Sequence, residues 1–200
     1  IKSKLLEPPT IELNERGKPL KFKWDKCKLE TVSFGHGITT TPVQAATVYS
    51  SLINGGFEIS PTLLKNKDNP KEKRIFSQAT TFKLKKILRQ VVTDKNGTAS
   101  LADIPGYYVS GKTGTSEYYE DEKKNINTFL GNFSVSGKDY IIMTIFDNPK
   151  IPKDLIYDYR GVKIKASRNE AGWNSAYVAG KIIEKIGPIL AINNDLIANN

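Results

Sequence analysis

The spacing of apolar residues changes along the chain from a helical to a strand-like repeat. Up to about residue 93, apolar residues recur every three or four positions, as on one face of an amphipathic helix. From residue 107 they alternate with polar residues, as in strands that bury one face. A helical repeat returns after residue 173. These patterns predict helices near 42–54, 77–93 and 174–186, and strands near 107–115, 127–135 and 139–147.

Helix-start and turn residues support these assignments. Thr41 before Pro42 is a good N-cap followed by proline at the first helical position, and Ser77 is a second N-cap. Ser136-Gly137-Lys138 is a short hairpin-type connection, so the last two strands are expected to be antiparallel. Most of residues 1–32, and residues 116–126 and 148–170, show no sustained repeat and are predicted as irregular segments.

Helices followed by an antiparallel meander and a further helix predict an α+β fold, with helices packed on a sheet. The 200 residues are enough for one domain or a large piece of one. The chain begins Ile1-Lys2-Ser3-Lys4, without an initiator methionine or a signal-peptide pattern. We therefore expect a portion cut from a longer protein.

The net charge of the chain and its distribution limit the kinds of binding partner that are expected. The formal net charge of +9 comes mainly from lysine spread along the chain, and the few arginines are not clustered. This distribution favours a generally cationic surface over a base-reading site, so no nucleic-acid partner is expected. Cys27 is the only cysteine, which excludes an internal disulfide and a cysteine metal cluster. We expect neither a metal nor a cofactor.

The candidate chemistry lies in Lys112-Thr113-Gly114-Thr115, at the end of a strand pattern. An edge strand can pair with an extended peptide through main-chain hydrogen bonds, and Gly111 and Gly114 would let a ligand backbone approach closely. Strand alternation places Thr113 and Thr115 on one face, where two hydroxyls can meet a carboxylate. Lys112 adds a cation that favours the same anion. The motif predicts recognition of an anionic peptide end.

The same stretch also fits a phosphate-binding loop. Gly106 to Thr113 matches G-x-x-x-x-G-K-[ST], and the apolar run ending in Asp147 resembles the strand that carries a magnesium-binding carboxylate. The residues between the two glycines suit a strand better than a loop around phosphates. A hairpin at 127–147 also replaces the parallel crossover that a nucleotide-binding fold requires. A P-loop NTPase is the remote alternative.

Several further segments stand in a characteristic order around the K-T-G element. They are Ser33-Phe34-Gly35-His36-Gly37-Ile38, Thr41-Pro42-Val43-Gln44, Asn54-Gly55-Gly56, Gly97-Thr98-Ala99, Gly106-Tyr107 with Gly111 to Thr115, Phe129-Leu130-Gly131 and Ala171-Gly172-Trp173-Asn174-Ser175-Ala176. Together they resemble class B penicillin-binding proteins, the transpeptidases that cross-link peptidoglycan, and the K-T-G element is one of the signatures of penicillin-binding proteins and serine β-lactamases. The element that opens the last helix resembles division-type transpeptidases of α-proteobacteria.

This resemblance implies roles for individual residues. Lys112 would help to hold the proton network and the substrate carboxylate, and Thr113 and Thr115 would bind that carboxylate or the one on a β-lactam. The backbone N–H of Thr115 would be one of two oxyanion donors, and Gly114 and Ser116 would complete the substrate-binding strand. The implied ligands are peptidoglycan stem peptides and β-lactams, the implied place is the periplasmic face of the bacterial inner membrane, and divisome proteins are possible partners.

Two family signatures are missing from these 200 residues. No serine has a lysine three residues later, as the nucleophile's S-x-x-K signature requires. Ser167-Arg168-Asn169 matches S-x-N but follows K-T-G instead of preceding it, so we interpret it as coincidence. The chain is expected to be the C-terminal portion of one transpeptidase domain, inactive alone, with self-pairing or the absent N-terminal portion covering exposed apolar surface. A non-catalytic penicillin-recognition module or degenerate homologue is the alternative.

Overall fold

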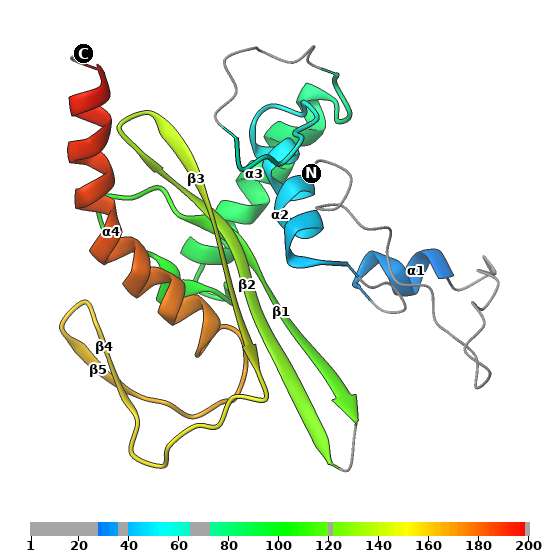
Figure 1. The fold of residues 1–200 in the computed structure, drawn as a ribbon. Coiled ribbons are helices and arrows are strands. Elements are labelled where there is room, and N and C mark those ends of the chain that lie inside the picture. Colours follow the sequence, from blue (N-terminus) through cyan, green and yellow to red (C-terminus); the bar gives the residue numbers. More distant parts are fainter. Residues whose placement is uncertain (1–27, 36–39, 65–72, 120–121, 199–200) are drawn as a thin grey trace.

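The computed structural model describes residues 28–35, 40–64, 73–119 and 122–198; part of the Ser33–Ile38 motif lies outside them. Its element order is α1 (Lys28–Ser33), α2 (Pro42–Ile53), α3 (Gln78–Thr93), the 3-10 helix η1 (Ser100–Ala102), β1 (Ser110–Tyr119), β2 (Lys123–Val135), β3 (Lys138–Asp147), β4 (Ile156–Tyr159), β5 (Val162–Lys165) and α4 (Ser175–Ala198). The α+β prediction is confirmed (Figure 1).

The main sheet is antiparallel with the order β1-β2-β3. Ser136 and Gly137 join β2 to β3 with φ angles of 47° and 76°. Positive φ at both positions is the type I′ geometry, whose twist matches that of the paired strands. The predicted hairpin is confirmed. The C-terminal end of β1 and the N-terminal end of β2 project beyond the helices in Figure 1.

Helices α3 and α4 and helix η1 cover one face of this sheet. Phe129 and Phe133 on β2 are fully buried there with Val92 of α3 and Ile183 of α4. Helix α2 reaches the opposite face, where the Tyr49 hydroxyl is directed at Asn132 Oδ1 of β2 (3.0 Å). The sheet is therefore held between helices, and the packed layers fix where β1 lies.

Several segments differ from the sequence prediction, and the strand predicted from residue 107 begins at Ser110. Most of the segment 116–126 is strand and not loop, because β1 continues to Tyr119 and β2 starts at Lys123. In the segment 148–170, β4 and β5 form a second hairpin whose turn, Arg160-Gly161, has φ angles of 53° and 76°. Residues 28–33 form the short helix α1. Helix α4 does not end at 186 but continues through Pro188 to residue 198.

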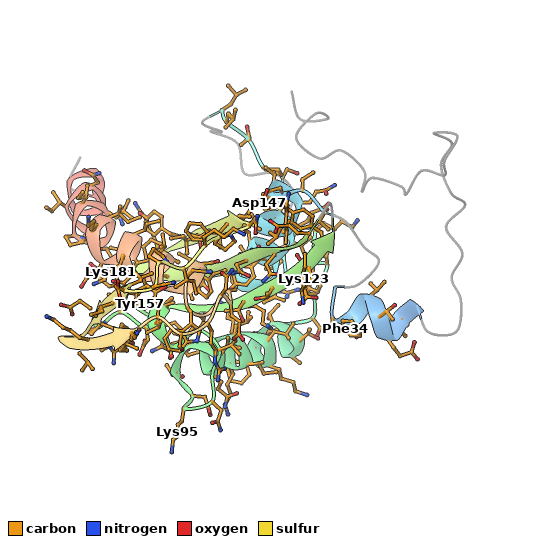
Figure 2. All side chains as sticks on the ribbon, turned by 90° about the horizontal axis from the view of Figure 1, so that it is seen from below. Phe34, Lys95, Lys123, Asp147, Tyr157 and Lys181 are labelled. Atoms are coloured by element: carbon orange, nitrogen blue, oxygen red, sulfur yellow. The ribbon has the colours of Figure 1, made fainter. Side chains whose placement is uncertain are left out.

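The second hairpin packs against α4 through aromatic rings. The Tyr157 ring lies 4.3 Å from that of Tyr177 and 6.4 Å from that of Trp173, measured between centroids. Lys181 Nζ lies over the Tyr177 ring, and Figure 2 shows Tyr157 and Lys181 together on one side of the molecule. No helix within the described ranges is long and apolar enough to cross a lipid bilayer.

Candidate active site

Strand β1 carries the K-T-G-T sequence along an edge of the main sheet. Among the described strands only β2 pairs with it, in a register that sets Lys112 opposite Leu130 and Thr115 opposite Asn127. An edge strand of this kind has backbone N–H and C=O groups directed away from its neighbour, and these can pair with an extended peptide.

The two faces of β1 differ. Lys112, Gly114 and Ser116 lie on one face and are exposed to solvent. Lys112 Nζ donates to the Thr113 carbonyl oxygen (2.6 Å). A Cβ on Gly114 would meet nothing within 4 Å, so close approach of a ligand is open there.

Gly111 has a different role from the one predicted. A Cβ at this position would lie 2.6 Å from Phe129 Cζ and 2.7 Å from the Leu130 carbonyl oxygen. The space beside Gly111 is thus filled by the buried Phe129 ring and is closed to a ligand. The missing side chain serves internal packing, and only Gly114 fits the predicted access role.

The other face of β1 forms one wall of a pocket of about 880 Å³. Thr113, Thr115 and Glu117 line it from the strand. The loop after α3, including Asn96 to Thr98, and the segment from Arg168 to Trp173 supply two further walls. The lining also includes Ser100, Leu101, Asn125 and Ile164. Both predicted carboxylate-binding threonines therefore face the same concave space, as strand alternation predicts.

Both threonine hydroxyls have partners in the pocket wall. Thr113 Oγ1 lies 2.7 Å from Thr98 Oγ1, and either atom can be the donor. The backbone N–H of Ala171 donates to Thr115 Oγ1 (3.1 Å). The two side chains are thus held in position by residues from two segments that are distant in sequence.

Asn169 fixes the segment from Arg168 to Trp173 in the pocket wall. Its Nδ2 donates to the Pro149 carbonyl oxygen (2.7 Å), while its Oδ1 accepts from Asn127 Nδ2 (3.3 Å) and Asn174 Nδ2 (3.2 Å). These contacts give Asn169 a structural role in the pocket wall. The sequence did not indicate Arg168, Glu170 or Trp173 as pocket residues, because no spacing rule connects them to a strand more than fifty positions away.

The root of β1 is fixed by a buried polar cluster. Ser110 Oγ donates to Asn132 Oδ1 (2.6 Å), which also accepts from the Tyr49 hydroxyl. Burial raises the pKa of Tyr49 to about 12, with the hydrogen bond to Ser110 acting in the opposite direction. This cluster joins α2 to the start of β1, two residues before Lys112.

The phosphate-loop alternative is contradicted. Ser110 to Tyr119 is a strand that pairs antiparallel with β2, where a nucleotide-binding loop would lead into a helix and a parallel crossover. Asp147, the candidate magnesium ligand, instead accepts a hydrogen bond from the Tyr118 hydroxyl (2.6 Å). Lys112 is therefore a strand residue and not part of a phosphate cradle.

Comparison with known proteins shows which family this chain belongs to. The family model for the penicillin-binding protein transpeptidase domain matches residues 8–169. The chain belongs to the penicillin-binding protein transpeptidase family. The predicted resemblance to class B penicillin-binding proteins is thereby confirmed.

Relatives within the family cover most of the chain. A probable peptidoglycan D,D-transpeptidase FtsI from Caulobacter vibrioides is 31% identical over 203 residues, which span 94% of this chain and 33% of the relative. Stage V sporulation protein D from Bacillus subtilis is 28% identical over 159 residues, spanning 70% of this chain and 24% of the relative. The chain thus spans about a third or less of these relatives.

Solved transpeptidase domains share the fold. The transpeptidase domain of penicillin-binding protein 3 from Burkholderia pseudomallei aligns with a TM-score of 0.68 at 24% identity, covering 90% of this chain and 53% of that one. The transpeptidase domain of FtsI4 from Legionella pneumophila gives 0.60 at 23% identity, covering 82% and 53%. The chain therefore corresponds to about half of each of these domains.

Proposed function

We propose that the protein containing this chain is a peptidoglycan D,D-transpeptidase that acts through a serine acyl-enzyme. The supporting observation is that Thr113 and Thr115 face one pocket from an edge strand that also carries Lys112. In this proposal a stem peptide pairs with the edge of β1, and its carboxylate binds the two hydroxyls beside the lysine cation.

This chain supplies the recognition part of that mechanism. The backbone N–H of Thr115 stabilises the oxyanion of the tetrahedral intermediate, and loss of one such donor typically costs about a hundredfold to a thousandfold in rate. Lys112 helps to hold the active-site proton network. Gly114 leaves room for the peptide and Ser116 extends the substrate-binding strand. The nucleophile is not contributed by these 200 residues, because none of their serines has the S-x-x-K spacing.

The proposal also covers the domain organisation, the location and the partners of the parent protein. The chain represents the C-terminal portion of the transpeptidase domain, and the S-x-x-K and S-x-N signatures belong to the N-terminal portion that packs against it. The parent protein faces the periplasm from the inner membrane, works with divisome proteins and is a target of β-lactams. The FtsI name of the Caulobacter vibrioides relative supports the division role.

A binding titration tests the recognition step. The 200-residue chain is titrated with N-acetyl-D-alanyl-D-alanine and with its C-terminal amide, followed by NMR shifts of backbone amides. We expect the carboxylate form to bind more tightly, with shifts centred on Lys112 to Ser116. Thr113→Val and Thr115→Val should each reduce the preference for the carboxylate. Equal binding of the two ligands would contradict the proposal.

A labelling experiment separates the enzyme from the non-catalytic recognition module. The complete product of the gene is incubated with fluorescent penicillin and resolved under denaturing conditions. A denaturation-stable label lost on Lys112→Ala supports the acyl-enzyme. Reversible ligand binding without a stable label favours the recognition module.

A further inference from the structure

We propose that Thr98 is a positioning residue, which acts with the Ala171 N–H to direct the hydroxyl protons of Thr113 and Thr115 at one bound carboxylate. This inference rests on the proposed function, since it assumes that the pocket face of β1 receives an anionic peptide end. It adds a residue from outside β1 to that recognition, and it makes both hydroxyls donors to the carboxylate once the ligand is bound.

The contact of Thr115 shows first which way its hydroxyl proton must point. A hydroxyl carries one proton and two acceptor lone pairs, whereas a backbone N–H can only donate. The Ala171 N–H therefore fixes Thr115 Oγ1 as the acceptor in their contact (3.1 Å). The proton of the Thr115 hydroxyl remains to be donated to another group, and Thr115 lines the pocket.

Like Thr115, Thr113 donates its hydroxyl proton to the carboxylate when an anion binds. Either hydroxyl can donate in the 2.7 Å contact between Thr98 Oγ1 and Thr113 Oγ1. A carboxylate only accepts, so Thr113 must give its proton to the ligand and accept the proton of Thr98. The resulting series, from Thr98 to Thr113 to carboxylate, is strengthened because each hydrogen bond polarises the next.

Thr98 is suited to this role because its backbone is tightly held while its side chain reaches the pocket. The N–H of the neighbouring Ala99, which is fully buried, donates to the Val91 carbonyl oxygen at the end of α3 (3.0 Å). A Cβ on Gly172 would lie 2.2 Å from the Thr98 carbonyl oxygen, so the two backbones are in direct contact. The hydroxyl therefore projects from a fixed point.

The test measures dissociation constants of the 200-residue chain for N-acetyl-D-alanyl-D-alanine and for its C-terminal amide. Thr98→Val should weaken binding of the carboxylate about threefold to tenfold, the range expected for one hydrogen bond, and affect the amide much less. Thr98→Ser keeps the hydroxyl and should restore most of the loss. Thr93→Val is the matched control, because its hydroxyl bonds only within α3, to the Arg89 carbonyl oxygen.

A double mutant separates positioning from general support of the fold. In a Thr113→Val background, Thr98→Val should cause no further loss, because Thr98 acts through Thr113. A further loss there, or equal weakening of the carboxylate and the amide, would overturn the inference. Thr98→Ala provides a second deletion of the hydroxyl if the valine variant folds poorly.

The outcomes also distinguish this inference from the function on which it rests. A wild-type chain that binds carboxylate and amide equally contradicts carboxylate recognition itself, and the role of Thr98 falls with it. A wild-type chain that prefers the carboxylate, together with an unchanged preference in Thr98→Val, overturns only the positioning role.

Discussion

At the scale of single residues, the two glycines beside Lys112 show how one residue type serves opposite purposes. Gly111 lets the Phe129 ring approach the backbone of β1, whereas Gly114 leaves the strand open on its exposed face. The sequence motif predicts both glycines as points of ligand access. Only the packing of β2 against β1 distinguishes them, since it depends on a residue that lies eighteen positions further along the chain.

Substitution of each glycine by alanine should therefore have different effects. Gly111→Ala places a methyl group against a fully buried ring and a backbone oxygen, and we expect a loss of about 1–3 kcal/mol in the free energy of unfolding. Gly114→Ala should leave stability within about 0.5 kcal/mol. Urea denaturation of both variants measures the contrast, and equal losses would show that Gly111 is not required for packing.

Ionisation of Tyr49 should lower the free energy of unfolding at high pH. Its pKa is raised to about 12 by burial, while an unfolded tyrosine ionises near its ordinary value of 10.0. Below pH 10 the phenol is neutral in both states and its stabilising contribution is complete. As the pH rises from 10 towards 12, the unfolded state releases the proton first, so this contribution is lost.

Comparison with Tyr49→Phe isolates this effect. Between pH 9 and pH 11.5 the wild-type chain should lose on the order of 1–2 kcal/mol more unfolding free energy than the variant, because phenylalanine cannot ionise. Parallel chemical denaturation at both pH values provides the measurement. An identical pH dependence in the two proteins would mean that the Tyr49 phenol ionises as it does in the unfolded chain.

At the scale of helices and strands, the local sequence was sufficient to predict an element where a helix cap or a turn residue marked its end. The Thr41 side chain accepts from the Gln44 N–H and the Gln44 side chain accepts from the Thr41 N–H, so the predicted start of α2 is a complete capping box. Ser77 likewise caps α3. The hairpin at Ser136-Gly137 and the strands around it were also recognisable from turn residues and alternation.

Tertiary packing decided the elements that the sequence did not reveal. Gly187-Pro188 is a normal helix end, yet α4 continues because the Tyr107 ring occupies the space beside Gly187 and Leu190 packs on the core. Arg160-Gly161 is a weak turn signal, and the β4–β5 hairpin around it is held by the rings that pack on Tyr157. Neither outcome follows from local sequence alone.

The side chain of Asn194 also holds the segment of α4 after Pro188. Asn194 Oδ1 accepts from Lys138 Nζ (2.9 Å) and the Tyr140 hydroxyl (3.0 Å), and its Nδ2 donates to the Val135 carbonyl oxygen (3.3 Å). Proline has already removed one backbone hydrogen bond from this helix. The contacts of Asn194 therefore join its last turns to the β2–β3 turn.

Asn194→Ala should release this segment and cost about 1–2 kcal/mol in unfolding free energy, because three buried or half-buried contacts are lost. Hydrogen exchange of the amides after Pro188 should accelerate more than exchange in the first half of α4. Asn193→Ala, at an exposed neighbouring position, is the control. Uniform acceleration along the whole helix would contradict a local role.

At the scale of the whole molecule, the described residues form one pocket and the core that supports it. The pocket lies where β1, the loop after α3 and the segment before α4 meet, so its shape depends on how these three segments pack together. The family could be predicted from ordered motifs. The pocket could not, because it is formed by residues distant in sequence.

The 200-residue chain on its own should not be labelled by fluorescent penicillin. Covalent labelling requires an activated serine, and no serine here has the S-x-x-K spacing. The measurement is in-gel fluorescence after denaturation, with the complete gene product as the positive comparison. Stoichiometric labelling of the 200-residue chain would show that another of its serines is activated, and it would contradict this division of roles.

The contact between Gly172 and the Thr98 backbone also limits how the pocket can evolve. A side chain at Gly172 would collide with the Thr98 carbonyl oxygen, and one at Gly97 would collide with the Val91 carbonyl oxygen, so substitution at either position displaces the pocket wall. Arg168 and Glu170 line the same pocket but are exposed. Under selection for altered ligand preference, adaptive mutations should accumulate at these exposed positions, while the two glycines remain unchanged.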